Sequence, residues 1–191
     1  MTNGWTATMN KGYFITNCFD DAEQCKRYAE RMLILEKTPN VFADPTFGGA
    51  KSAYRLYDDL LELKIPHVEE LVGKKLFPTY SYSRIYRNGH YMEPHKDRDA
   101  CEYSVSITMG YGNVEKPYPI CFGTEELHLD INEMVVYKGR DVVHWRDVWD
   151  CPDDAWQVQI FLHYVDQDGP FASERNDVTR REEAEKLFGK K

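Results

Sequence analysis

The first third of the chain switches between a short apolar run and stretches with helical periodicity. Residues 12–19 (GYFITNCF) form an apolar, partly β-branched run that predicts an opening strand. Apolar side chains then recur three or four positions apart, which predicts a helix to about Lys37. Asp20 is the expected N-cap of this helix, because Glu23 follows it with the spacing of a capping box.

Two further helices are expected after a loop. Residues 38–51 hold two prolines and two adjacent glycines, a composition that predicts a loop. A third, short helix is expected to begin at Pro66 and to end at Gly73 as its C-terminal cap. Between them, a second helix is predicted by an apolar stripe at helical spacing, made of Ala53, Leu56, Tyr57, Leu60 and Leu61.

From Pro78 onward the period of the pattern changes to two. Residues 103–109 alternate Tyr, Val, Ile and Met with Ser and Thr, which predicts a strand with one polar face. Further strands are predicted at residues 118–122, 127–137, 142–148 and 156–165. An earlier strand places four large side chains on one face, namely Tyr80, Tyr82, Arg84 and Tyr86. Many short strands separated by turns predict a sandwich or barrel, so the expected class is mainly β with flanking helices.

Composition and charge bound the size and the class of the protein. With 191 residues, of which 42% are hydrophobic, the chain is long enough for one core and short for two. We expect one domain over residues 1–171 and a charged tail or frayed helix over residues 172–191. The balance of 24 basic and 32 acidic residues gives 24 − 32 = −8, which argues against a protein that mainly grips nucleic-acid phosphates.

The cysteines and the apolar runs bear on the cellular compartment. The five cysteines are widely spaced and contain no CxxC pair, so reduced thiols are expected in place of a disulfide framework or a zinc finger. No apolar run approaches the ~20 residues of a membrane-spanning helix, and the polar first eleven residues do not resemble a signal peptide. A cytoplasmic protein without a membrane partner is therefore expected.

One histidine and one aspartate have the spacing of metal ligands. His95 and Asp97 stand two residues apart, so on an extended chain their side chains leave the same face and can reach one ion. His144, after the apolar pair at 142–143, is the favoured third ligand, whereas His128 and His163 also lie on predicted strands and stay alternatives. Two imidazoles and one carboxylate on one face suit a non-haem ferrous ion with open positions. The HxD pair alone also occurs by chance, as a surface histidine beside a solvated aspartate.

The context of this pair resembles a known family. Residues 86–89 (YRNG) followed by 93–97 (EPHKD) are similar to the prolyl-4-hydroxylase-like branch of the 2-oxoglutarate and Fe(II)-dependent dioxygenases. Two other marks, HxDRxxCExS over residues 95–104 and HWR at 144–146, resemble a less characterised subgroup. The resemblance implies a double-stranded β-helix, a jelly-roll or cupin-like barrel with the N-terminal helices on one side. It also implies that His95, Asp97 and His144 bind Fe(II), and that Tyr86 donates a hydrogen bond to 2-oxoglutarate.

The chain departs from the family where the distal carboxylate of 2-oxoglutarate is normally held. That anchor is an arginine or lysine about ten or more residues beyond the distal histidine, yet no basic residue occurs between Arg146 and Arg175. The expected position holds Gln157 and Gln159 instead. Since a buried carboxylate needs a cation, either the charge comes from elsewhere or the cosubstrate differs. In order of preference, the possible cations are Arg146, Arg84, and then Arg98 or Lys138, with Gln157 as a neutral supporting donor.

Two functions from different classes follow. The first is a dioxygenase that uses Fe(II), 2-oxoglutarate and O2 to hydroxylate an unactivated carbon of a peptide side chain or small molecule, with release of succinate and CO2. The alternative is a non-catalytic jelly-roll module that binds a ligand or a partner, with a structural or vestigial metal site. The missing downstream arginine favours the alternative. The primary substrate and the oligomeric state do not follow from the sequence.

Overall fold

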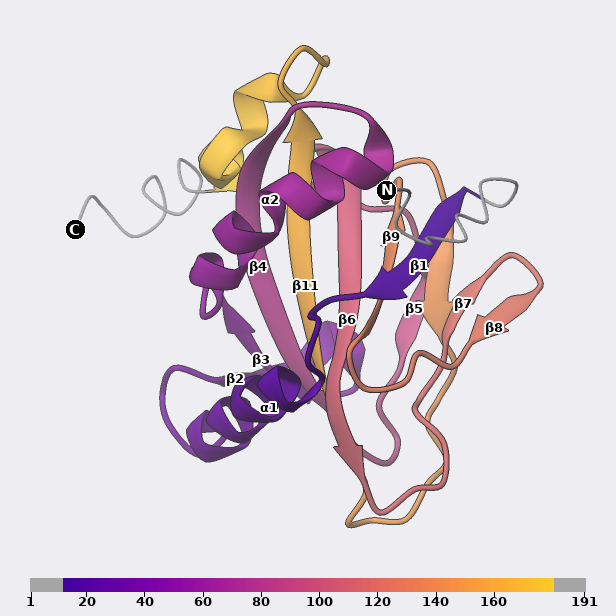
Figure 1. Ribbon diagram of the computed structural model, residues 1–191. Coiled ribbons are helices and arrows are strands. Elements are labelled where there is room, and N and C mark those ends of the chain that lie inside the picture. The colour runs from indigo at the N-terminus through magenta and orange to yellow at the C-terminus, as the bar shows by residue number, and fades with distance from the viewer. Residues whose placement is uncertain (1–11, 181–191) are drawn as a thin grey trace.

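The computed structural model describes residues 12–180. It contains two antiparallel sheets and two α-helices, α1 (Glu23–Leu35) and α2 (Asp58–Val72), as Figure 1 shows. The strands are β1 (Tyr13–Asn17), β2 (Phe42–Asp44), β3 (Ala50–Tyr54), β4 (Leu76–Tyr86), β5 (Met92–His95), β6 (Tyr103–Gly112), β7 (Ile120–Phe122), β8 (Glu125–Leu127), β9 (Glu133–Tyr137), β10 (His144–Arg146) and β11 (Trp156–Asp166). The large sheet has the order β1-β9-β6-β11-β4-β3-β2, and the small sheet has the order β5-β10-β7-β8.

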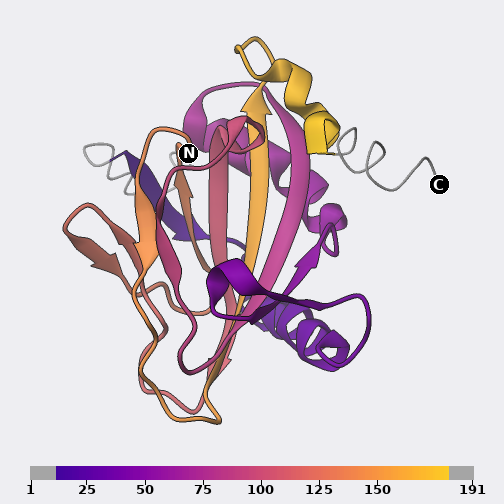
Figure 2. The same cartoon turned by 180° about the vertical axis from the view of Figure 1, so that it is seen from behind.

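The two faces of the large sheet have different partners. Both helices pack on one face, so that from behind the sheet stands in front of them (Figure 2). On β6, the side chains of Val105, Ile107 and Met109 belong to the apolar core beneath the helices. The alternate residues Ser104 and Ser106 are equally buried but point to the other face, toward the small sheet. The inner face of β6 therefore contributes buried polar groups to the space between the two sheets.

The helices differ from the sequence predictions in two details. Helix α1 begins at Glu23, and its first backbone N–H is held by Asp21 Oδ1 at 2.9 Å, so the prediction of Asp20 as the N-cap was wrong. The second and third predicted helices are one helix, which continues through Pro66. It continues because Leu61 and Val68, on either side of the proline, are buried in the same core. Gly73 ends the helix as predicted, with φ of 69° and its N–H donated to the Glu69 carbonyl.

The predicted loop at residues 38–51 was also wrong, since most of it forms a hairpin. Strands β2 and β3 pair with each other, with a short 3₁₀ turn at Pro45–Phe47 between them. Ala53, which the stripe placed in a helix, lies in β3 opposite Ser83 of β4. Pairing with a long neighbouring strand overrides the local signal here, because the two prolines lie outside the paired residues. Likewise, the strand predicted at 127–137 is split into β8 and β9.

The end of the described chain packs against the barrel. A 3₁₀ segment, Ala172–Asp177, lies beside β4. Its Asp177 is fully buried, 2.6 Å from the Arg98 guanidinium, and accepts a hydrogen bond from the Tyr54 hydroxyl. The tail predicted for residues 172–191 thus begins inside the packed structure, and its last eleven residues lie outside the described ones. All five cysteines are free thiols. No helix within residues 12–180 has the length and apolar character needed to cross a lipid bilayer.

Candidate metal centre

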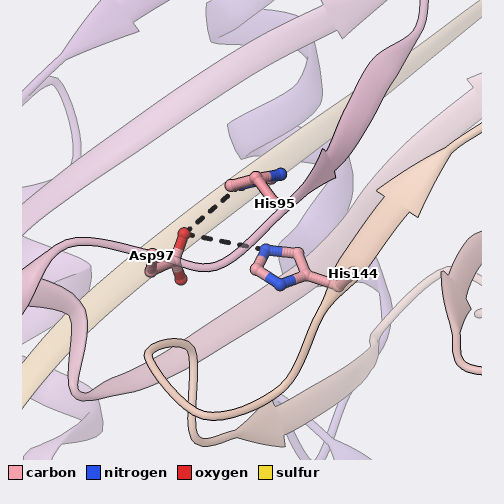
Figure 3. A group of neighbouring side chains, drawn as sticks. All are labelled: His95, Asp97 and His144. Atoms are coloured by element: carbon pink, nitrogen blue, oxygen red, sulfur yellow. Dashed lines mark ion pairs between the residues drawn. The ribbon is translucent and has the colours of Figure 1, made fainter.

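The three predicted metal ligands meet between the two sheets. His95 ends β5, Asp97 follows two residues later, and His144 begins β10, which pairs with β5 in the register His144 opposite His95. The Nε2 atoms of the two histidines lie 3.4 and 3.7 Å from Asp97 Oδ1 (Figure 3). All three potential ligand atoms are within 4.8 Å of one another. Because ligands at ~2.0–2.2 Å from one ion are separated by about 3 Å or slightly more, this spacing fits a single divalent cation.

Both histidine rings are held in the same tautomer. Nδ1 of His95 lies 2.8 Å from the Glu93 carbonyl oxygen, and Nδ1 of His144 lies 3.1 Å from the Val142 carbonyl oxygen. A carbonyl can only accept, so each Nδ1 carries a hydrogen, and in the neutral form of each ring the Nε2 atom has a lone pair that a metal ion beside Asp97 could bind. Metal-binding histidines characteristically donate their other N–H in this way. The donor set of two imidazole nitrogens and one carboxylate oxygen suits a first-row divalent metal.

The electrostatics of the three side chains also favour a bound cation. Burial alone would raise the pKa of Asp97, but the hydrogen bond from His95 and the nearby imidazoles outweigh it and lower that pKa to about 2. Burial lowers the pKa of His144, which keeps its imidazole neutral. The hydrogen bond to Asp97 raises the pKa of His95 in the metal-free protein. Near neutral pH the centre therefore offers a carboxylate and at least one neutral imidazole.

The three side chains open onto a cavity of about 230 Å³. Many of the side chains that line it carry aromatic rings. Besides the metal ligands, its charged side chains are one carboxylate and two guanidinium groups, from Asp44, Arg84 and Arg180, and its rings include Phe47, Tyr80, Tyr82 and His163. Of the four side chains predicted to bind the cosubstrate, only Arg84 lies on this wall, whereas Tyr86, Arg146 and Gln157 lie deeper in the barrel and are fully buried.

The Arg84 guanidinium contacts several neighbouring side chains. Its Nη1 donates to the Tyr86 hydroxyl at 2.8 Å, and its Nε donates to Ser52 Oγ at 3.2 Å. A carboxylate oxygen of Asp44 is 3.8 Å from Nη2, and the guanidinium carbon stands 3.5 Å from the centre of the Phe47 ring. The positive charge of Arg84 is therefore already balanced by a carboxylate of the β2–β3 hairpin.

Arg146, in contrast, has no acidic partner within residues 12–180. Its Nη1 donates to the backbone carbonyls of Tyr118 and Pro119, and its Nε is buried without a hydrogen-bond partner. Within residues 12–180, no carboxylate lies within ion-pair distance of it. Burial lowers the pKa of Arg146, but an arginine stays protonated at neutral pH. Among the described residues, Arg146 thus brings a positive charge with no acidic partner into the barrel interior, its guanidinium carbon 5.2 Å from the centre of the Tyr86 ring.

The other residues predicted to bind the cosubstrate or the metal lie at several different places in the structure. The Gln157 amide is bonded to the backbone of Tyr118, accepting from its N–H at 2.7 Å and donating to its carbonyl at 3.2 Å. That carbonyl also accepts from Arg146, so Gln157 supports the same region. Arg98 is paired with Asp177, and Lys138 is exposed. Of the alternative ligands, His128 lies outside the triad, bonded to the Pro117 carbonyl, while His163 lines the same cavity.

This chain is similar to known proteins in its three-dimensional structure. No protein-family model matches the chain, and no curated protein matches it in sequence. The viral collagen prolyl hydroxylase of Paramecium bursaria Chlorella virus-1, in a 2OG complex, is similar with a TM-score of 0.61 and 11% identity, over 82% of this chain and 97% of that one. The non-heme alpha-ketoglutarate-dependent epimerase SnoN of nogalamycin biosynthesis has a TM-score of 0.63 and 14% identity, over 83% and 80%. The fold is that of the 2-oxoglutarate and Fe(II)-dependent oxygenases.

This oxygenase fold also occurs in a structure that holds a peptide. A prolyl hydroxylase from Trichoplax adhaerens, in complex with a peptide from the oxygen degradation domain of hypoxia inducible factor, has a TM-score of 0.62 and 14% identity, over 83% of this chain and 86% of that one. The predicted fold class is therefore confirmed: a mainly β double-stranded β-helix with helices packed on one side.

Several residues around the three potential metal ligands were not singled out from the sequence. Asp44 and Phe47 belong to the hairpin that was predicted as a loop, so no strand pattern pointed to them. Ser104 donates to Asp97 Oδ2 at 2.7 Å, and the Asp97 N–H is held by the Gly139 carbonyl at 2.9 Å. Ser104 ends the HxDRxxCExS motif and lies on the polar face of its predicted strand, and these two signals could have identified it.

Gly139 offers a direct test of the geometry around Asp97. A Cβ atom at this position would lie 2.2 Å from Asp97 Oδ2 and 2.5 Å from Ser104 Oγ, closer than non-bonded atoms approach. Gly139→Ala should therefore displace the carboxylate and weaken Co(II) binding by about tenfold or more, the range typical of a lost supporting contact. Gly123→Ala, in the β7–β8 turn, has open space around the added atom but a φ of 59°, so it strains the backbone away from Asp97 and is the control for general destabilisation. Equal Co(II) affinity in both variants would contradict this placement of Asp97.

Proposed function

We propose that this protein is an Fe(II) and 2-oxoglutarate-dependent dioxygenase that hydroxylates an unactivated carbon, with release of succinate and CO2. The observation that carries the proposal is the convergence of two imidazole Nε2 atoms on Asp97 Oδ1, with both Nδ1 atoms bonded to backbone carbonyls. This arrangement lies in a barrel with the oxygenase fold. A peptide side chain or a small molecule is the proposed substrate, and the peptide-bound prolyl hydroxylase of similar fold supports the first of these.

The proposed roles of the protein side chains follow from their places in the barrel. His95, Asp97 and His144 would hold the iron from one side, which leaves positions for 2-oxoglutarate and O2 on the other. The bound iron and the keto acid would supply the oxidative chemistry that protein side chains lack. The protein itself would position the cosubstrate, in a cavity lined by many aromatic side chains.

We assign the distal carboxylate of 2-oxoglutarate to Arg146. Its guanidinium is buried and, within the described chain, faces no acidic partner, so a dicarboxylate would supply the missing negative charge. It also stands two residues from His144 on β10, and both side chains are buried. Arg84 ranks second because Asp44 already balances it. Gln157 supports Arg146 through their shared contact with the Tyr118 carbonyl.

Tyr86 is proposed to donate a hydrogen bond to the cosubstrate. Its hydroxyl accepts from Arg84 and, within residues 12–180, donates to no acceptor, so its hydrogen is available. Tyr86→Phe should therefore cost on the order of 1.5–3 kcal/mol of 2-oxoglutarate binding, the usual value for a hydrogen bond to an anion. Titration of the Fe(II)-loaded protein measures this constant, and metal affinity should be nearly unchanged. An unchanged 2-oxoglutarate constant would leave Tyr86 with a packing role only.

A spectroscopic titration tests the proposed function as a whole. Under anaerobic conditions, Fe(II) and 2-oxoglutarate together should produce a weak visible charge-transfer band that neither produces alone. The absence of this band in a protein that holds zinc and unfolds when a chelator removes it would instead identify a structural metal site. Release of succinate from 2-oxoglutarate in the presence of O2 would then establish turnover.

A further inference from the structure

The carboxylate of Asp97 has a second set of contacts on the side away from the histidines. Ser104, fully buried on the inner face of β6, places its Oγ 2.7 Å from Asp97 Oδ2. The same Oγ lies 3.0 Å from Nδ1 of His163 on β11, and 3.4 Å from the Cys101 carbonyl oxygen. One hydroxyl thus touches three polar groups, although it has a single hydrogen to donate.

The distances and charges decide where that hydrogen goes. Asp97 is ionised and can only accept, and a 2.7 Å contact to a carboxylate is a strong, charge-assisted hydrogen bond. The carbonyl of Cys101 is 0.7 Å farther away and uncharged. Ser104 therefore donates to Asp97 Oδ2, and its oxygen accepts from His163, which must carry its hydrogen on Nδ1. The chain of donors runs from His163 to Ser104 to Asp97.

We propose that Ser104, oriented by His163, is a positioning residue that fixes Asp97 as a one-oxygen metal ligand. Oδ2 is held by the serine, while Oδ1 faces the Nε2 atoms of His95 and His144. The inference rests on the metal centre of the proposed function. A carboxylate held in this way cannot turn to bind the ion through both oxygens, so a coordination position stays open for the cosubstrate or O2.

The surroundings of Ser104 leave this carboxylate little freedom. Gly139 lies directly against both groups and leaves room only because it has no side chain. On the other side, the His163 ring packs against the Tyr80 ring, with 4.5 Å between the ring centres and 34° between the ring planes, which restricts the imidazole. The serine lies on β6, the glycine in the segment after β9, and the histidine on β11.

A different reading would make His163 itself a metal ligand, since Asp97, Cys101 and His163 also lie within 4.8 Å of one another. The contacts within that cluster argue against it. The Cys101 sulfur is 3.1 Å from the Tyr80 hydroxyl, and Nδ1 of His163 is 3.0 Å from Ser104 Oγ. Ligand atoms of that cluster are therefore already engaged by neighbouring hydroxyl groups.

The experiment is a titration of the metal-free protein with Co(II), followed by its visible absorption. Ser104→Ala should bind Co(II) about 10–100-fold more weakly than the parent, as is typical when a supporting contact to a metal ligand is lost. Ser104→Thr, which retains the hydroxyl, should recover most of the affinity. The matched control is Ser106→Ala, because Ser106 lies on the same face of β6, is equally buried, and bonds to Gln159 instead. Its Co(II) affinity should equal that of the parent.

A fourth variant separates the two roles open to His163. His163→Asn keeps a donor near the place of Nδ1 and removes Nε2, so its Co(II) affinity should stay within several-fold of the parent. A loss as complete as that of Asp97→Ala would make His163 a ligand and overturn the inference. Equal affinities of Ser104→Ala and the parent, or equal losses in Ser104→Ala and Ser106→Ala, would also overturn it. Failure of the parent to bind Co(II) would instead overturn the metal centre of the proposed function.

Discussion

Replacing Asp97 with alanine should abolish turnover of 2-oxoglutarate and weaken metal binding by more than the ~100-fold that loss of an outer contact can cost. Asp97 is the only carboxylate in the proposed ligand set, and its Oδ1 is the atom on which both Nε2 atoms converge. Without it, two neutral imidazoles remain, which carry no charge to balance that of the ion. The measurements are Fe(II) or Co(II) affinity and succinate release.

The barrel itself should survive this change. The main apolar core lies beneath the helices, on the other face of the large sheet from Asp97. Far-UV circular dichroism and a urea unfolding curve test this point. The matched control is Asp99→Ala, since Asp99 lies two residues away but is exposed and paired with Arg140. Decarboxylation of 2-oxoglutarate by Asp97→Ala at the parent rate would remove Asp97 from the ligand set.

Replacing Arg146 should produce the largest loss of cosubstrate affinity. Truncation of one partner of a buried charge pair costs roughly 2–5 kcal/mol, which corresponds to about 30-fold to several thousandfold in the dissociation constant. Arg146→Met is the sharpest variant because it keeps much of the buried volume and removes the charge. Arg146→Lys should recover little, since one ammonium cannot reproduce the two-pronged contact of a guanidinium. The measurement is titration of the Fe(II)-loaded proteins with 2-oxoglutarate.

Two further variants decide between the possible anchors. Arg84→Met removes a cation that lines the cavity but already has Asp44 as its partner, so it should weaken 2-oxoglutarate binding less than Arg146→Met. Gln157→Ala should have an intermediate effect, since it loosens the Tyr118 backbone that Arg146 contacts. If Arg84→Met loses binding while Arg146→Met binds like the parent, the anchor is on β4 and the assignment to β10 is wrong.

The strand pattern was readable from the sequence because it depends on alternation, a property of neighbouring residues. On β6, the serines and the apolar residues separate onto opposite faces, as their period predicted. His95 and Asp97 could be paired for the same reason, since a two-residue spacing fixes a shared face. The likeness of residues 86–104 to a known family then indicated the barrel, and with it the meeting of His95 with His144, which lies far along the chain.

Only the tertiary structure decided which charged groups have partners. Arg84, Arg98 and Arg146 look alike in sequence, yet Asp44 lies beside the first, Asp177 beside the second, and no described carboxylate beside the third. Pro66 stays within a helix because core contacts on both sides outweigh one missing hydrogen bond. Ser104 reaches Asp97 and His163 because β6 lies next to β11. Local pattern sets the face on which a side chain lies, but its partners come from strands and loops far away in the chain, and only their packing brings them together.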